Sequence, residues 1–430
     1  MGIKTKRFIV SRTSCSCCMP GVWSALAHCQ GFVVIFHSPR ACAHVTRTME
    51  INSHFRSISD SNGEGMPAIP LLSSQLEEKH TIFGGSDRLS KCISYAVETY
   101  KPKCIAIANS CIAGVIGDDV ESAAREAEEK YNIPILTIDS FGFLDGEYYE
   151  GYFSMTEKLI NRFIKTVPKE KGTVVLLGDN GGPWGNYAKE VTALLSALGL
   201  KVIGQFPGYI SFEEMAKIGR AEGSIVLGGR GQTYVGLNAV ARRLNTDFDI
   251  KYLDGIYPLG WQGTERWIQK IAELFDCEDK AKDLIWQERQ RLLQGLNKYL
   301  PLTKGKKTVL CIGRWLIYFH PAGVLETIKT LQLDLQGIIL LDAYDEEHKR
   351  EMLNMLKAYT NKPILDTKEG EKLLRDAELV LTTHELKHPE LKQIFLPMLP
   401  QVGISGELHF MDVIYRTLRS RLKQGGVIYV

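Results

Sequence analysis

Residues 32–42 read Phe-Val-Val-Ile-Phe-His-Ser-Pro-Arg-Ala-Cys, a short apolar run followed by a polar loop that ends in a cysteine. Residues 104–111 repeat this arrangement as Cys-Ile-Ala-Ile-Ala-Asn-Ser-Cys. Similar β-rich runs alternate with amphipathic helical stretches along the chain, which is the pattern of parallel sheets covered by helices. Because ligands bind beyond the carboxyl ends of such strands, we expect Cys42 and Cys111 at the same edge of one sheet.

Working outward from these two segments, the pattern predicts an α/β fold. Two charged or Pro/Gly-containing breaks, at residues 165–171 and 300–307, divide it into three Rossmann-like parallel-sheet domains with helices on both faces, at 1–168, 169–304 and 305–430. The Ser-, Gly- and Pro-rich stretch 57–74 is expected to be a long loop. The expected strands are 32–36, 104–108, 135–138, 173–177, 202–206, 224–227, 308–312, 337–341 and 379–382, and the clearest helices are 120–131, 187–198, 264–275, 284–299, 346–359 and 411–422.

Composition narrows the possible functions. The chain has 430 residues, 44% of them hydrophobic and 24% charged, so it can bury a large core. A formal net charge of +2 gives no global reason to expect a nucleic acid or a membrane surface as partner. No apolar run reaches the roughly 18 to 20 residues of a membrane-spanning helix, and the first ten residues lack the pattern of an export signal. We therefore expect a cytoplasmic protein.

The ten cysteines are concentrated at one end of the chain. Cys15, Cys17 and Cys18 lie within four residues, and Cys42 and Cys111 follow at strand ends. In a long cytoplasmic chain, clustered thiols are more often metal ligands than disulfides. Zinc is the main competitor to an iron–sulfur cluster, but the chain lacks the paired Cys-x-x-Cys motifs or downstream His pair of zinc sites. The loop that carries Cys111, together with the family resemblance given next, favours the iron–sulfur cluster. The remaining cysteines lie in apolar patterns that are typical of core residues: Cys29, Cys92, Cys104, Cys277 and Cys311.

Three segments resemble the nitrogenase component 1 superfamily. The phrase Asn-Ser-Cys-Ile-Ala-Gly-Val-Ile-Gly-Asp-Asp at 109–119, with Ile-Phe-Gly-Gly at 82–85 before it, is similar to the family. So is the loop 37–42, which matches His-Gly-x-x-Gly-Cys except that Ser38 and Ala41 replace the glycines. Cys-Met-Pro-Gly at 18–21 lies where β-type subunits have Cys-x-Pro-x-Gly. The family includes nitrogenase, its cofactor-assembly scaffold, protochlorophyllide reductase, the nickel-tetrapyrrole reductase of coenzyme F430 synthesis and methylthio-alkane reductase.

The resemblance implies a cofactor and partners. Cys42 and Cys111 would be ligands of an iron–sulfur cluster at a subunit interface, of P-cluster-like 8Fe-7S or 4Fe-4S type. Cys18 is the best match for the third ligand, and Cys17 or Cys15 could take its place. The partners would be a related α-type subunit, in a heterotetramer, and a separate ATP-dependent iron–sulfur reductase. No Walker motif occurs in this chain, and the glycine-rich loop 178–186 is more typical of a structural turn, so ATP use would belong to the partner.

One departure from the family limits the function. Where α-type subunits have a cysteine that anchors the active-site cofactor, this chain has Gly228. The chain therefore resembles a β-type, electron-transfer subunit of a nitrogenase-like oxidoreductase. Two other interpretations stay open: a homodimer that reduces a tetrapyrrole-type or other substrate in its own cavity, and a scaffold for metal-cluster assembly.

Overall fold

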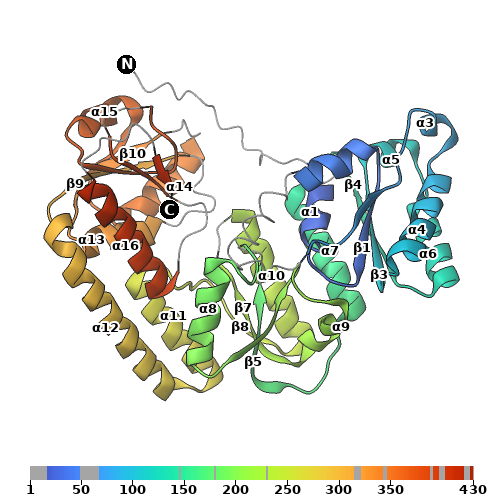
Figure 1. The fold of residues 1–430 in the computed structure, drawn as a ribbon, viewed down its shortest axis with the longest axis horizontal. Helices are drawn as coiled ribbons and strands as arrows, with labels where there is room; N and C mark the ends of the chain where they lie inside the picture. The colour runs from blue at the N-terminus through green and yellow to red at the C-terminus, as the bar shows by residue number, and fades with distance from the viewer. Residues whose placement is uncertain are drawn as a thin grey trace.

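The computed structural model describes residues 17–48, 67–144, 147–178, 181–228, 231–313, 321–341, 346–387, 391–396, 402–420 and 427–429. Figure 1 shows three α/β regions, and in each of them helices pack against a sheet. The part of the chain covered by these ranges contains no helix long and apolar enough to cross a membrane.

The first sheet has the strand order β2-β1-β3-β4, and all neighbouring strands are parallel. Its strands are β1 (Phe32–His37), β2 (Leu71–Ser73), β3 (Cys104–Asn109) and β4 (Ile135–Phe141). Every residue of β1 and β3 is buried, as expected for strands covered on both faces. Side chains alternate between the two faces, so Val33 and Ile35 pack toward α4 (Ser86–Tyr100) and α6 (Val120–Tyr131). Val34 and Phe36 join the core on the other face, beside α1 (Met19–Ser24) and α7 (Tyr148–Phe163).

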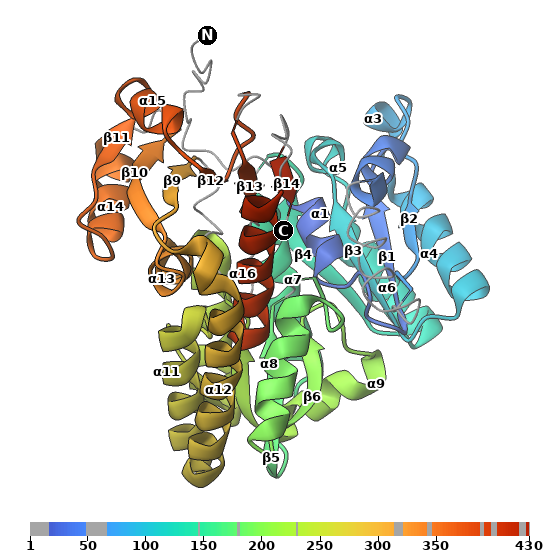
Figure 2. The same ribbon diagram turned by 60° about the vertical axis from the view of Figure 1, so that its left-hand side comes forward.

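The second sheet repeats this topology in the order β6-β5-β7-β8. Its strands are β5 (Glu170–Leu177), β6 (Lys201–Phe206), β7 (Ala221–Val226) and β8 (Lys251–Leu253), with α8 (Asn186–Ala197), α9 (Phe212–Met215), η1 (Ala216–Arg220), α10 (Gly231–Phe248) and α11 (Gly260–Phe275) around it. The main core is continuous across the first two sheets, because Phe36 of β1 and Leu177 of β5 belong to the same buried cluster. The two sheets therefore form one packed body (Figure 2).

The third sheet is parallel, in the order β11-β10-β9-β12-β13-β14. Its strands are β9 (Lys307–Ile312), β10 (Asp334–Leu340), β11 (Ile364–Asp366), β12 (Leu379–Thr382), β13 (Gln393–Phe395) and β14 (Val427–Tyr429), with α13 (Pro321–Thr330), α14 (Glu346–Lys357) and α15 (Thr367–Arg375). The long helix α12 (Glu278–Thr303) leads into it, and α16 (Gly403–Arg419) packs back against α12, α11 and α8.

The α/β fold with parallel sheets predicted from the sequence is confirmed. All nine expected strands and all six expected helices are found with differences at their ends, and residues 421–422 of the last expected helix lie outside the described residues. One sheet lies in each of the expected ranges 1–168, 169–304 and 305–430, whose boundaries stay a prediction. Of the expected loop 57–74, residues 57–66 lie outside the described residues, and Leu71–Ser73 in the remainder forms the edge strand β2. This strand lacked a sequence signal because it has only three residues and borders serines and a proline.

Candidate iron–sulfur site

Cys42 and Cys111 follow the two strands at which the order of the first sheet reverses. The chain passes from β1 to β2 on one side of β1, and β3 then pairs with its other side. Such a reversal opens a crevice at the carboxyl ends of the two strands, where ligands bind in α/β proteins. The last residue pair of β1 and β3 is His37 with Asn109, so the loops carrying Cys42 and Cys111 leave the sheet side by side. This adjacency is what the sequence predicted.

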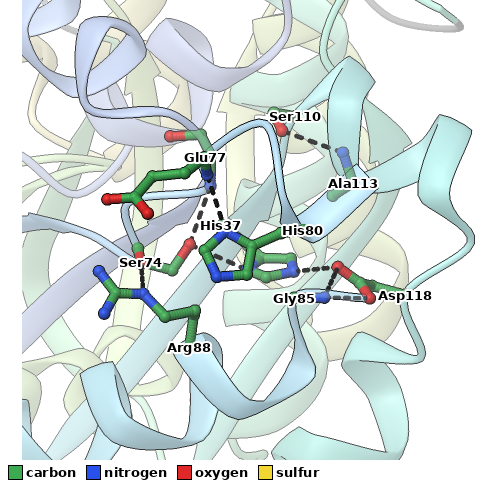
Figure 3. Close-up of polar contacts among 10 residues, drawn as sticks. His37, Ser74, Glu77, His80, Gly85, Arg88, Ser110, Ala113 and Asp118 are labelled. Carbon is green, nitrogen blue, oxygen red and sulfur yellow. Dashed lines mark hydrogen bonds and ion pairs between the residues drawn. The ribbon is translucent and has the colours of Figure 1, made fainter. Parts of the chain in front are cut away.

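A buried polar network fixes these two loops to each other (Figure 3). The His37 ring is fully buried, and its Nε2 lies 2.9 Å from Oδ2 of Asp118, which follows α5 (Cys111–Ile116). The other ring nitrogen, Nδ1, lies 3.0 Å from the hydroxyl of Ser74, at the end of β2. That hydroxyl also accepts the backbone N–H of Ser38 at 3.1 Å. One imidazole thereby connects the Cys42 loop, the edge strand and the Cys111 loop.

The protons in this network can be assigned from its chemistry. Burial lowers the pKa of His37, although hydrogen bonding and charge from Asp118 act in the opposite direction, so the ring is neutral near pH 7. A carboxylate only accepts, so Nε2 carries the proton and donates it to Asp118. Nδ1 then accepts from the Ser74 hydroxyl. Each polar group in this network therefore has a hydrogen-bond partner, and a network of this kind holds the two loops in one arrangement.

The glycine pair 84–85 completes the same network. The N–H of Gly85 donates to both carboxylate oxygens of Asp118, at 2.8 and 3.0 Å. A Cβ at position 85 would lie 2.4 Å from Leu76, 2.6 Å from Asp118 and 3.1 Å from His37, so no larger residue fits there. Three segments that resemble the family in sequence therefore meet at one point in the structure.

A third element brings the remaining cysteines toward these loops. Helix α1 crosses α7 at close range, because a Cβ at Gly21 would lie 1.8 Å from the Tyr148 carbonyl oxygen. The N–H of Cys18, just before α1, donates to the Gly142 carbonyl at 3.3 Å. A Cβ on Gly142 would in turn lie 2.7 Å from the backbone nitrogen of Cys111. Gly142, after β4, is thus the shared contact between the Cys18 and Cys111 segments.

The candidate ligands differ in exposure. Cys17, Cys42 and Cys111 are half-buried and form no disulfide, whereas Cys18 is fully buried, and Cys15 lies outside the described residues. Burial raises the pKa of Cys42, with a hydrogen bond from Ser38 acting in the opposite direction and the nearby Cys111 adding to the rise. In the described ranges no three Cys, His, Asp or Glu side chains converge closely enough to hold one metal ion. A polynuclear cluster takes its thiolates one per iron, so its ligands stand farther apart, and soft thiols are the donors it needs.

The other described cysteines occupy different environments. Cys29, Cys104 and Cys311 are fully buried in apolar clusters or strands, which agrees with the core role expected for them. Burial raises the pKa of Cys29 to about 11, so this thiol is neutral. Cys277 and Cys92 are half-buried.

Large apolar side chains are exposed around the thiol loops. Ile82 and Phe83 of α3 (His80–Phe83) are 78% and 84% exposed, and Val115 of α5 is 78% exposed. Phe143 and Leu144, which follow the shared contact Gly142 in the sequence, are also exposed. Val45, three residues after Cys42, is exposed as well. Isolated exposed hydrophobic residues are common, but these six all lie on the segments that carry the two thiols or on segments next to them. We call these six residues the apolar rim.

The second sheet has the same reversal of strand order, between β5 and β7, and the described residues that follow these two strands include no cysteine. Gly228, directly beyond β7, donates its N–H to the Tyr187 hydroxyl at 2.8 Å. A Cβ at position 228 would lie 2.5 Å from that hydroxyl and 2.6 Å from the Tyr257 ring. Two tyrosines therefore occupy the space that a side chain at position 228 would need. The glycine-rich loop 178–186, whose residues 179 and 180 are not described, leads into α8, as a structural turn would.

The sequence analysis pointed to the candidate cysteines but not to the side chains that hold their loops together. His37 was recognised as part of a loop motif, whereas its partners Ser74 and Asp118 were not predicted. Asp118 pairs with His37, whereas its neighbour Asp119 caps α6. The His37–Asp118 pair could have been suggested by one signal in the sequence, which is a histidine at the end of one strand and an aspartate after the glycine turn that follows the neighbouring strand.

Comparison with known proteins agrees with this geometry. Residues 17–419 match the family model "Nitrogenase component 1 type Oxidoreductase". The chain is 30% identical over 286 residues to the nitrogenase iron-molybdenum cofactor biosynthesis protein NifE of Clostridium pasteurianum, covering 65% of this chain and 58% of that protein. It is 26% identical over 290 residues to the nitrogenase molybdenum-iron protein alpha chain of Methanosarcina barkeri, covering 65% of this chain and 52% of that one.

A solved structure of "Nitrogenase Cp1 at pH 6.5" superposes with a TM-score of 0.66 and 16% identity, over 97% of this chain and 91% of that chain. This likeness supports the fold. The resemblance first seen in three short motifs is confirmed along most of the chain. This chain therefore belongs to the nitrogenase component 1 type oxidoreductase family.

Proposed function

We propose that this chain is the cluster-bearing subunit of a nitrogenase-like reductase. Cys42 and Cys111 hold an iron–sulfur cluster, which stores electrons and passes them on when it is bound. The observation that carries the proposal is the pair of half-buried thiols in the first crevice, locked in place by the His37–Asp118 network. The residues fit such a group because they offer soft donors on loops whose backbone is already fixed.

We assign Cys18 as the third ligand. Its backbone is bonded to Gly142, and Gly142 contacts Cys111, so the start of α1 is tied to the same loop. The complete burial of Cys18 argues against its role as a ligand. If Cys18 is not the third ligand, the half-buried Cys17 is the next candidate, followed by Cys15. Iron content of the three single Cys→Ser variants separates these choices, because only loss of a true ligand lowers it strongly.

The apolar rim supports a partner subunit over the cluster. A related α-type chain that covers Ile82, Phe83 and Val115 would bury these side chains and shield the thiols from water. The filled space at Gly228 supports placing substrate chemistry in that related chain. Electrons would arrive from a separate ATP-dependent iron–sulfur reductase.

A second candidate function is a scaffold for metal-cluster assembly. It is favoured by the similarity to the NifE cofactor biosynthesis protein, together with the absence of a cysteine at position 228. The two functions differ in turnover. A catalytic subunit, combined with its reductase and partner, consumes ATP and reduces substrate steadily, whereas a scaffold releases its cluster to an acceptor protein once.

The test is anaerobic co-purification of the full chain with metal and sulfide analysis. We expect a brown protein that contains iron and acid-labile sulfide and that retains a related subunit. Cys42→Ser and Cys111→Ser should remove most of the iron, whereas Cys92→Ser, at a half-buried thiol of the same sheet region, should retain it. Stoichiometric zinc without iron would contradict the proposal.

A further inference from the structure

A separate cavity of about 580 Å³ lies beside the Cys42 segment. It is open to solvent and is lined by the helical residues 40–48, the edge strand β2 and helix α4. Its volume falls within the range of small-molecule sites. The lining residues are Arg40, Ala43, His44, Arg47, Leu71, Leu72, Ser73, Ser74, Gln75, Arg88, Lys91, Cys92 and Tyr95.

The cavity is strongly cationic. Four of its lining side chains, Arg40, Arg47, Arg88 and Lys91, are positively charged, and none of the lining residues is Asp or Glu. In the described part of the chain none of the four forms an ion pair. Arg88 is held in place by a hydrogen bond from its Nε to the Ser74 carbonyl at 3.2 Å.

No nearby group cancels this charge within the lining. Burial raises the pKa of Cys92 to about 11, so its thiol stays neutral. Glu77 interacts with Arg88, but it lies outside the lining and pairs with Lys79 at 2.8 Å. The whole chain carries a net charge of only +2, so four cations around one cavity are a local concentration that like-charge repulsion disfavours without an anion.

The rest of the lining is part polar, from His44, Ser73, Ser74 and Gln75, and part apolar. Leu71 and Leu72 of β2, Ala43 and Tyr95 contribute hydrocarbon and ring surface between the charged groups. A bare inorganic anion would pair with the cationic side chains but leave this apolar surface in contact with water. A molecule with an organic frame would cover both.

We propose that this cavity binds a small organic polyanion, a molecule with two or more carboxylate or phosphate groups on a short carbon frame. Arg47 lines it from the helical segment 40–48 and Lys91 lines it from α4, so both helices offer a cation to one bound anion. Arginine and lysine are the usual partners of carboxylate and phosphate groups. The site is distinct from the thiols, although Arg40 and Ala43 flank Cys42 in sequence.

The test is isothermal titration calorimetry on the purified full chain at a constant ionic strength of about 0.1 M, where long-range screening is fixed. The probes are citrate, inorganic phosphate and triethyl citrate, the last being an uncharged analogue of the first. We expect saturable binding of citrate near one equivalent, weaker binding of phosphate and none of the triester. Inorganic phosphate binding tighter than citrate would overturn the proposal, because the organic frame would then contribute nothing to binding.

Arg47→Gln and Lys91→Gln should each weaken citrate binding, and the double variant should weaken it at least about tenfold, since two attracting charges are removed. Both positions are exposed, so folding should be unaffected. Arg125→Gln, at an exposed position on α6 outside the cavity, removes the same charge and should bind like the wild type. Absence of saturable binding of both anions, or equal binding by the wild type and the double variant, would overturn the proposal. The cluster plays no part in this test, so its outcome is independent of the proposed function.

Discussion

Replacing Asp118 with alanine tests whether the His37 network holds the two thiol loops. The side chain of Asp118 is only 4% exposed, and His37 is fully buried. Alanine would remove the acceptor of two donors, the His37 Nε2–H and the Gly85 backbone N–H. Water cannot reach the buried imidazole unless the loops separate.

The free energy lost in Asp118→Ala follows from the two hydrogen bonds that it removes. A hydrogen bond to a charged group contributes about 1.5 to 3 kcal/mol, so two of them contribute about 3 kcal/mol or more. At about 1.4 kcal/mol for each factor of ten, local opening of the loops should become about a hundredfold more frequent. The effect should be local, because the cores of the other two sheets do not depend on Asp118.

Hydrogen–deuterium exchange measured by mass spectrometry reports this opening directly. Peptides covering residues 32–44 and 71–86 contain the amides of Ser38, Leu76 and Gly85, which are bonded within the network. The neighbouring Asp119 provides a matched control, because its carboxylate only caps α6 through the Ser122 N–H at 2.9 Å. Asp119→Ala should cost about 1 kcal/mol and affect only the start of α6.

Iron content should follow the same order, with a strong loss in Asp118→Ala and little change in Asp119→Ala. The reasoning would be refuted if exchange in the peptides 32–44 and 71–86 rose less than about fivefold in Asp118→Ala, or if both variants behaved alike. Either result would mean that the loops are held by other contacts.

Two further predictions concern the other sheets. Burial raises the pKa of Glu407 to about 8, so the folded protein keeps a proton that the unfolded chain loses above pH 4.5. Burial of this carboxyl therefore lowers the free energy of unfolding increasingly as pH rises, by about 3 kcal/mol at pH 7. Glu407→Gln removes the titrating group but keeps an acceptor for the Thr327 hydroxyl. In denaturant titrations this variant should be more stable than the wild type at pH 7 but not at pH 4. Gly228→Cys should lower the thermal midpoint by several degrees, because its Cβ would overlap Tyr187 and Tyr257, and an unchanged midpoint would show that the tyrosines move freely.

The parts of the site that could be predicted from sequence depend on local pattern. An apolar run ending in a loop indicates a buried strand, and parallel pairing then brings the loop ends together, which placed Cys42 beside Cys111. Residues 120–131 were predicted as a helix with correct bounds, because Asp119 caps the start and a left-handed Asn132 ends it.

The parts that could not be predicted depend on contacts across the sequence. His37 and Asp118 are 81 residues apart, and nothing in either segment alone requires the other. The importance of Gly21, Gly85 and Gly142 likewise comes from the atoms that a side chain would strike, which belong to other elements. The same limit applied to β2, whose three residues pair with β1 only because the loop bonds around Ser74 hold them there.

The two crevices show how one topology can serve different roles in this family. Both arise where a sheet reverses its strand order, so both offer a place for a ligand. In the first sheet the loops present thiols, and the apolar rim leaves them for a partner to cover. In the second sheet Tyr187 and Tyr257 fill the space beside Gly228, which leaves no room for a thiol to anchor a cofactor there. Under the proposed function, a chain that carries the cluster but lacks the second anchor needs another protein to complete the reaction, which is the physical reason to search for its partner before its substrate.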